Sequence, residues 1–187
     1  MPWIVIGVIV FFLVIFIAIY NQLVGLRQNC KQGWADIDAQ LKQRHDLIPN
    51  LVNTVGGYAA HEKSTLEAVT KARNSAVGAQ GAAAIANAEG GLSSALGKLF
   101  ALAENYPDLK ANQNFMGLQN ELADVEDKLA ASRRAFNAAA AIYNSAREEF
   151  PAVLVARGMG FAEQSFWALD VGERIAATAN PEVKFNG

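Results

Sequence analysis

An apolar repeat of seven residues runs from Trp34 to Val69 and predicts one long amphipathic helix. Its two rows, the first-helix seam, contain Trp34, Leu41, Ile48, Val55 and Val69 in one and Ile37, Leu51 and Tyr58 in the other. A period of 3.5 is typical of helices that pack side by side along their length. Pro49 lies inside the repeat, but the phase is unchanged after it, so we expect a kink there rather than a break.

Two charged residues interrupt the first-helix seam. Arg44 and Glu62 occupy seam positions where the pattern otherwise places apolar side chains. Their long stems can extend past the seam to water. Alternatively, they fix the register by pairing with charges on another helix or another copy, which makes both candidate register or oligomer contacts.

The segment 2–20 is free of charged side chains and consists mainly of Ile, Val, Phe and Leu. As a helix it is about 28 Å long, close to the thickness of a bilayer's hydrocarbon core. Its aromatic residues, the candidate membrane-anchor residues, are Trp3, Phe11, Phe12, Phe16 and Tyr20. A cleaved signal peptide is the alternative, but no basic segment precedes the run and no small-residue cleavage site follows it. We therefore expect residues 1–22 to form a single-pass anchor.

Positive charges follow the span and set its expected orientation. Arg27 and Lys31 come soon after Tyr20, whereas only the α-amino group of Met1 precedes the run. The positive-inside rule then places the N-terminus outside and the C-terminal body in the cytoplasm.

Three helices joined by short turns are expected between residues 23 and 150, at about 23–77, 82–105 and 112–150. The third carries the clearest repeat, in which the large seam residues are Phe115, Leu122, Leu129, Phe136 and Tyr143. Short connections favour antiparallel neighbours. The predicted fold class is all-α, with an N-terminal transmembrane helix followed by a long antiparallel three-helix, coiled-coil-like bundle.

Residues 151–187 are predicted to form a short helix and an aromatic tail without a steady period. Its candidate docking residues are Phe161, Phe166, Trp167 and Phe185. They either pack back on the helices of this chain or dock on a neighbouring copy or the membrane surface.

Composition excludes several classes of function. The formal net charge is −2, so no attraction to nucleic acid is expected. The single cysteine, Cys30, cannot form an intramolecular disulfide. It is read as a small seam residue, with an intermolecular disulfide or acylation as the alternatives.

The sequence carries no recognisable catalytic or cofactor motif. His61-Glu62 begins like a zinc-protease helix, but Thr65 stands where the second histidine is needed. His45 lies about 24 Å away along a continuous helix, too far to share a metal. We expect no enzymatic activity, no cofactor and no bound metal.

Several segments resemble the LemA family. They are Trp34-Ala-Asp-Ile-Asp38, Gln40-Leu41-Lys42, Arg44 to Val52, Gly57-Tyr58-Ala59, His61-Glu62, Tyr143-Asn144 and Pro181-Glu-Val-Lys-Phe185. The resemblance covers nearly the whole chain and departs from the family in the Ala- and Gly-rich middle and between Phe161 and Pro181. It implies a bacterial inner-membrane protein with one N-terminal span and a long helical domain, and no established enzymatic activity. Some relatives are associated with magnetosome membranes.

Two functions are therefore expected from different classes. The first is a non-enzymatic scaffold whose copies self-associate through the long helices and tail, as homo-oligomers that organise or shape the bilayer. The second is an accessory or adaptor subunit of another membrane protein, such as a protease or signalling kinase.

Overall fold

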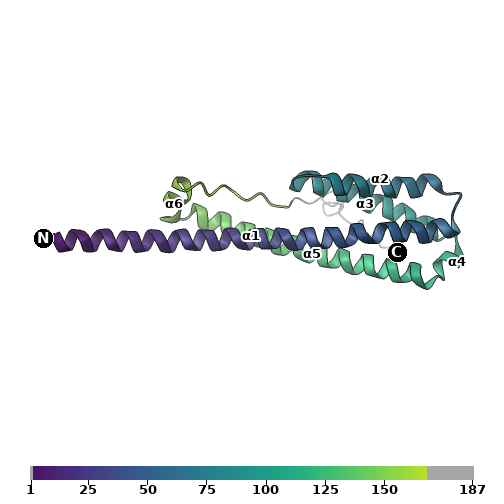
Figure 1. The fold of residues 1–187 in the computed structure, drawn as a ribbon, viewed down its shortest axis with the longest axis horizontal. Helices are drawn as coiled ribbons and strands as arrows, with labels where there is room; N and C mark the ends of the chain where they lie inside the picture. The colour runs from purple at the N-terminus through teal and green to yellow at the C-terminus, as the bar shows by residue number, and fades with distance from the viewer. Residues whose placement is uncertain (1, 168–187) are drawn as a thin grey trace, which may run out of the picture. The chain divides into compact units, whose positions relative to one another are not determined.

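The chain is helical almost throughout the part described by the computed structural model, residues 2–167. The helices in order are α1 (Pro2–Tyr58), α2 (Lys63–Gly78), α3 (Ala82–Ala103), α4 (Pro107–Lys110), α5 (Gln113–Glu148) and α6 (Ala152–Gly158) (Figure 1). No strand occurs among these residues. The prediction of an all-α protein with a long apolar N-terminal helix is confirmed.

Helix α1 contains 57 residues and continues through Pro49 without interruption. Among residues 2–167, it is the one helix that is long and apolar enough to cross a membrane. None of its most apolar 18-residue segment is buried by the rest of the protein. Trp3, Phe11, Phe12 and Phe16 all expose large apolar surfaces there. Length and composition therefore indicate membrane anchoring through α1.

The prediction that one helix runs from about residue 23 to 77 is wrong. Helix α1 ends at Tyr58, a short turn follows, and α2 begins at Lys63. Two successive glycines, Gly56 and Gly57, precede the break, and each weakens a helix by about 1 kcal/mol relative to alanine. Val55 and Val69 belong to the same row of the repeat although a turn separates them. Both are buried, Val55 before the turn and Val69 after it.

Contacts between Cα atoms divide the described chain into two compact units. The first comprises residues 2–41 and 127–166, and the second comprises residues 42–126 and Trp167. Each long helix, α1 and α5, contributes to both.

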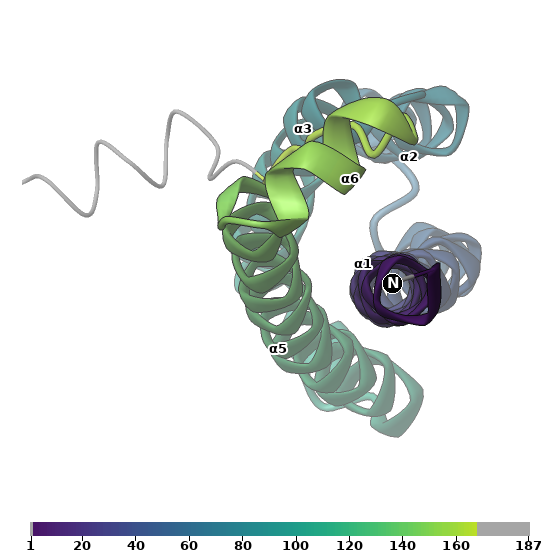
Figure 2. The same cartoon turned by 90° about the vertical axis from the view of Figure 1, so that its left-hand side faces the viewer.

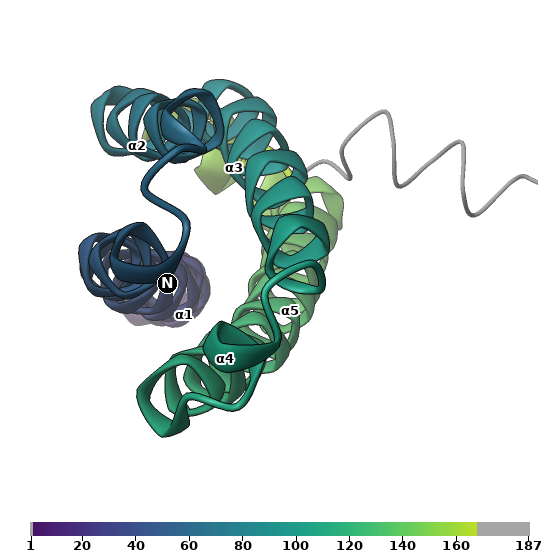
Figure 3. The same cartoon turned by 90° about the vertical axis from the view of Figure 1, so that its right-hand side faces the viewer.

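The second unit contains four long helical segments, from α1, α2, α3 and α5, and the short helix α4, instead of the three helices predicted. Helix α2 folds back along α1, because Arg73 Nε donates to the His45 carbonyl at 3.4 Å and Leu66 approaches Gly56. Figure 3 shows α2 and α3 side by side, with α4 leading into α5. The segments therefore alternate in direction. Their shared core is apolar and includes Ile48, Leu51, Val55, Val69, Leu92, Leu99, Leu109, Phe115 and Leu122.

The first unit packs α1 against the C-terminal part of α5. Trp34 meets Phe136 edge to face, with ring centroids 5.4 Å apart. Gly33 lies so close to α5 that a Cβ there would be 3.1 Å from the Phe136 Cα, so glycine permits this approach. The remaining core brings in α6 and contains Leu23, Cys30, Ala140, Tyr143, Val155, Ala156 and Phe161.

Candidate functional site

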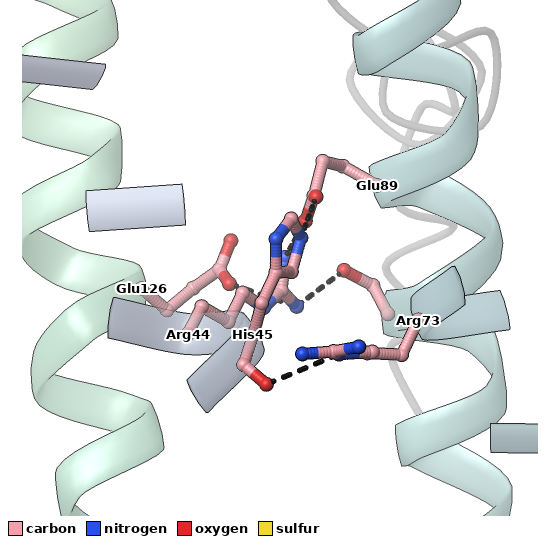
Figure 4. Close-up of polar contacts among 6 residues, drawn as sticks. Arg44, His45, Arg73, Glu89 and Glu126 are labelled. Atoms are coloured by element: carbon pink, nitrogen blue, oxygen red, sulfur yellow. Dashed lines mark hydrogen bonds and ion pairs between the residues drawn. The ribbon is translucent and has the colours of Figure 1, made fainter. Parts of the chain in front are cut away.

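The main polar feature of the second unit is a buried charged cluster. Arg44 and His45 come from α1, Glu89 from α3 and Glu126 from α5 (Figure 4). Arg73 of α2 donates to the carbonyl of His45, so all four segments of the unit reach the cluster. We call Arg44, His45, Glu89 and Glu126 the Arg44 cluster.

Glu89 is the centre of the Arg44 cluster, because its two oxygens take different partners. Arg44 Nη1 donates to Oε2 at 2.8 Å, and His45 Nε2 lies 2.6 Å from Oε1. A carboxylate only accepts hydrogen bonds, so the imidazole donates through Nε2. Charge-assisted bonds of this kind are stronger than neutral ones, and they offset the cost of removing the charges from water.

The second terminal nitrogen of Arg44, Nη2, contacts both α3 and α5. It donates to Ser93 Oγ at 2.8 Å and lies 3.1 Å from Glu126 Oε2. The side chain of Glu126 is 44% exposed, whereas that of Glu89 is only 2% exposed. Glu89 therefore neutralises Arg44 inside the protein, and Glu126 adds a weaker, screened contact at the surface.

The Arg44 cluster is suited to fixing helix register rather than to chemistry. Arg44, His45 and Glu89 are buried, and their mutual contacts occupy the charged atoms. Within residues 2–167, no three His, Cys, Asp or Glu side chains gather as potential metal ligands. A slip of one helix turn would separate Arg44 from Glu89 and leave both charges buried without partners.

Glu62, the other charged seam residue, lies in the turn before α2. Its carboxylate accepts a hydrogen bond from the Tyr106 hydroxyl at 3.3 Å. The contact therefore joins two connecting segments, and Glu62 is not opposite an arginine on a helix.

The candidate tail residues have different environments. Phe161 and Trp167 are buried within the chain, whereas Phe166 is half exposed. The Phe161 ring packs on Tyr20 and lies 4.9 Å from the Arg27 guanidinium. Phe185 lies outside the described residues. Only Phe166 among the described tail candidates thus offers a large apolar surface for another molecule.

Most of the predicted seam residues of both long helices are buried. Side chains exposed by less than a tenth are Leu41, Ile48, Val55, Phe115, Leu122, Leu129, Phe136 and Tyr143. Trp34 is half-buried against Phe136. Cys30 is also buried, and burial raises the pKa of its thiol, which disfavours the reactive thiolate.

Tyr143 and Asn144 hold the segment after α6 against α5. The Tyr143 hydroxyl donates to the Ala162 carbonyl at 2.9 Å. The Asn144 amide forms two bonds with the backbone of Gln164, donating to its carbonyl at 2.9 Å and accepting from its N–H at 3.0 Å. Adjacent side chains therefore supply the hydrogen bonds that this non-helical segment lacks.

Replacing Tyr143 by phenylalanine should cost about 0.5–1.5 kcal/mol of unfolding free energy near neutral pH. Burial raises the pKa of the Tyr143 phenol, while in the unfolded chain it ionises near its ordinary pKa of about 10. The stability from this group is therefore complete below pH about 10 and is lost as the pH rises further. Denaturant unfolding followed by circular dichroism should show the difference between the two proteins shrinking in alkali.

Tyr58 provides the matched control for that substitution. Its exposed hydroxyl accepts a hydrogen bond from Asn112 Nδ2 at 2.9 Å. Tyr58→Phe should cost less than Tyr143→Phe. A Tyr143→Phe difference that stays constant across the alkaline range would contradict the role given to the phenol proton.

The comparisons with known proteins agree with the helical, membrane-associated character of the chain. The LemA family profile matches residues 33–185. Magnetosome protein MamQ of Magnetospirillum gryphiswaldense is 27% identical over an alignment of 174 positions, which covers 79% of this chain and 64% of that protein. Magnetosome protein MamQ 2 of Paramagnetospirillum magneticum is 24% identical, covering 85% and 68%. Protein LemA of Metamycoplasma hominis is 25% identical, covering 72% and 62%. The chain thus spans about two thirds of the length of these curated relatives.

Sequence reasoning singled out Arg44 but missed its main partner, Glu89. A usable signal was present, because Glu89 and Lys98 are the only charged residues between Ala82 and Ala103. Glu89 also precedes Leu92, Leu96 and Leu99 at the spacing of one apolar helix face. A lone carboxylate on such a face indicates a buried cationic partner.

Proposed function

Since this chain belongs to the LemA family, we propose that it is a non-enzymatic, membrane-anchored helical scaffold. In this proposal, copies anchored in the bacterial inner membrane associate side by side and organise or shape the bilayer around them. The bundle lies in the cytoplasm and the N-terminus outside, since Arg27 and Lys31 follow the span.

The observation that carries the proposal is the continuity of α1. The same helix provides the exposed apolar segment and, further along, core residues such as Ile48 and Leu51. The bundle is thus joined to the anchor by regular helix, without a linker of glycine, serine or proline. The names of the MamQ relatives, which describe magnetosome proteins, support a role at a membrane.

We assign the contact between copies to exposed apolar side chains of the first unit. Arg44 and Phe161 already have partners within the chain, so we assign the contact between copies to other side chains. Ile142 of α5 and Phe166 remain exposed in the first unit. Exposed apolar side chains of this size are the natural anchors of an interface.

Light scattering and electron microscopy of the detergent-purified full-length chain test the scaffold. We expect a defined assembly larger than one chain. The double substitution Ile142→Lys and Phe166→Ser should reduce its mass at least twofold, while circular dichroism stays unchanged because both side chains are exposed. A monodisperse monomer of the unmodified protein would overturn the proposal.

A surface groove in the second unit favours the second candidate, an accessory subunit. The groove lies along α1 and α2 and is lined by Val52, Leu66, Glu67, Thr70, Lys71, Asn74 and Ser75. Its mixture of apolar and polar side chains suits a helix of another membrane protein. If the purified chain is monomeric, photo-crosslinking from Thr70 in cells is the next measurement, with exposed Asp36 as the control position.

A further inference from the structure

Helix α6 lies across the direction of α1. Figure 2 looks along α1 from its N-terminal end, so that α1 is seen end-on while α6 extends across the view at the near end of α5. Both helices belong to the first unit at this level. If α1 crosses a bilayer, α6 is therefore oriented along the membrane surface.

The segment after α6 meets α1 where the apolar span ends. The rings of Tyr20 and Phe161 pack edge to face, with centroids 5.6 Å apart. Arg27, one of the first cationic residues after the span, lies over the same Phe161 ring. Tyrosine and arginine are typical of the interface between hydrocarbon and water. This contact places α6 near the level of the lipid headgroups.

The outer side of α6 is unusually apolar for a seven-residue helix. Phe150, just before it, is 81% exposed, and Leu154 within it is 65% exposed. The inner side is already occupied, since Val155 and Ala156 are buried in the core of the first unit, against which Ile19 and Tyr20 at the end of the apolar span also pack. Phe150 and Leu154 thus add exposed apolar surface beside the end of the α1 span.

The single charged residue of α6, Arg157, lies beside its exposed apolar side chain. Arg157 is exposed and three residues from Leu154, so the two are neighbours on the helix surface. Arginine beside apolar side chains can extend to lipid phosphates while its stem stays near the acyl chains.

We propose that α6 is a second membrane contact, which rests on the surface of the bilayer that α1 crosses. Phe150 and Leu154 enter the boundary between headgroups and acyl chains, and Arg157 binds lipid phosphate. The occupant is lipid because α6 packs beside Ile19 and Tyr20, at the end of the exposed apolar span of the same unit. The inference rests on the anchor in the proposed function but is independent of self-association.

Nitroxide accessibility in the full-length protein tests this contact. Single cysteines replace Phe150 or Leu154 in a Cys30→Ala background, and the chain is reconstituted in vesicles of phosphatidylethanolamine and phosphatidylglycerol. Phe11→Cys is the lipid reference. Asp36→Cys is the water reference, since it is exposed and about 24 Å beyond Tyr20 along α1. Collision with oxygen reports lipid, and collision with a water-soluble nickel chelate reports water.

For labels at positions 150 and 154, the ratio of oxygen to nickel collisions should be at least threefold higher than for the label at position 36. Leu154→Gln should shift the label at position 150 toward water while circular dichroism stays unchanged. If the labels at 150 and 154 behave like the label at 36 while the label at 11 lies in lipid, the inference fails and the anchor stands. If the label at position 11 is also in water, the anchor and the proposed function fail together. Shielding of 154 from both reagents, relieved by added lipid, would assign the face to a second copy and overturn the inference.

Discussion

Replacing Glu89 by alanine is expected to lower the free energy of unfolding by about 3–5 kcal/mol. The change leaves the buried Arg44 guanidinium and His45 without their shared carboxylate. Only the exposed Glu126 and Ser93 then remain to stabilise the positive charge. Denaturant unfolding of the detergent-solubilised protein, followed by circular dichroism, measures the loss.

Glu126→Ala is the matched control for this substitution, because it removes the other carboxylate that contacts Arg44. It should cost about 0–1 kcal/mol, since the Glu126 side chain is 44% exposed and its contact with Arg44 is screened by water. The double change Arg44→Met and Glu89→Leu should cost much less than the sum of the single changes, because it leaves no unpaired charge of that pair. Equal losses for Glu89→Ala and Glu126→Ala would show that Glu89 is not the principal partner.

Leu129→Ala should destabilise the first unit by about 2–5 kcal/mol. Leu129 lies on α5 and is fully buried, so its truncation removes apolar contacts and leaves a cavity. For a chain of this size, the corresponding fall in melting temperature is about 4–20 °C. Thermal scans in detergent measure it. Met116→Ala on the same helix is the control and should change stability by less than about 0.5 kcal/mol, since Met116 is exposed. An unchanged melting temperature for Leu129→Ala would overturn the seam assignment.

The fold class followed from sequence because helix periodicity is a local signal. The apolar run of α1 and the repeat of α5 each contain many residues of one pattern, so single exceptions do not hide it. The turn after Tyr58 was missed for the opposite reason. Two adjacent glycines are a weak signal, and Glu62 was interpreted as a seam lapse although it lies in the turn itself.

Only part of the Arg44 cluster could be predicted from the sequence. A charge inside the first-helix seam marked Arg44, but its partner depends on how α3 lies beside α1. Glu89 is 45 residues away in sequence, and no local pattern specifies that pairing. His45 adjoins Arg44 and lies outside both rows, so periodicity assigned it no role.

The contacts of the aromatic tail were the least predictable part. Tyr143 appeared as a large seam residue, yet its hydroxyl binds a backbone carbonyl in a segment without regular structure. Backbone groups carry no sequence information, so such a bond cannot be inferred from residue types. The same holds for Phe161, whose position depends on the turn formed around α6.

Building the first unit from both ends of the chain has a consequence for its biosynthesis. Leu23 leaves the ribosome early, whereas its core partners Tyr143 and Phe161 are made about 120–140 residues later. At about 5–20 residues per second, that delay is roughly 6–28 s. During this time α1 is already complete, but the apolar side that begins at Leu23 lacks the α5 segment that later covers it. Newly made chains therefore pass through an interval in which this side of α1 is uncovered.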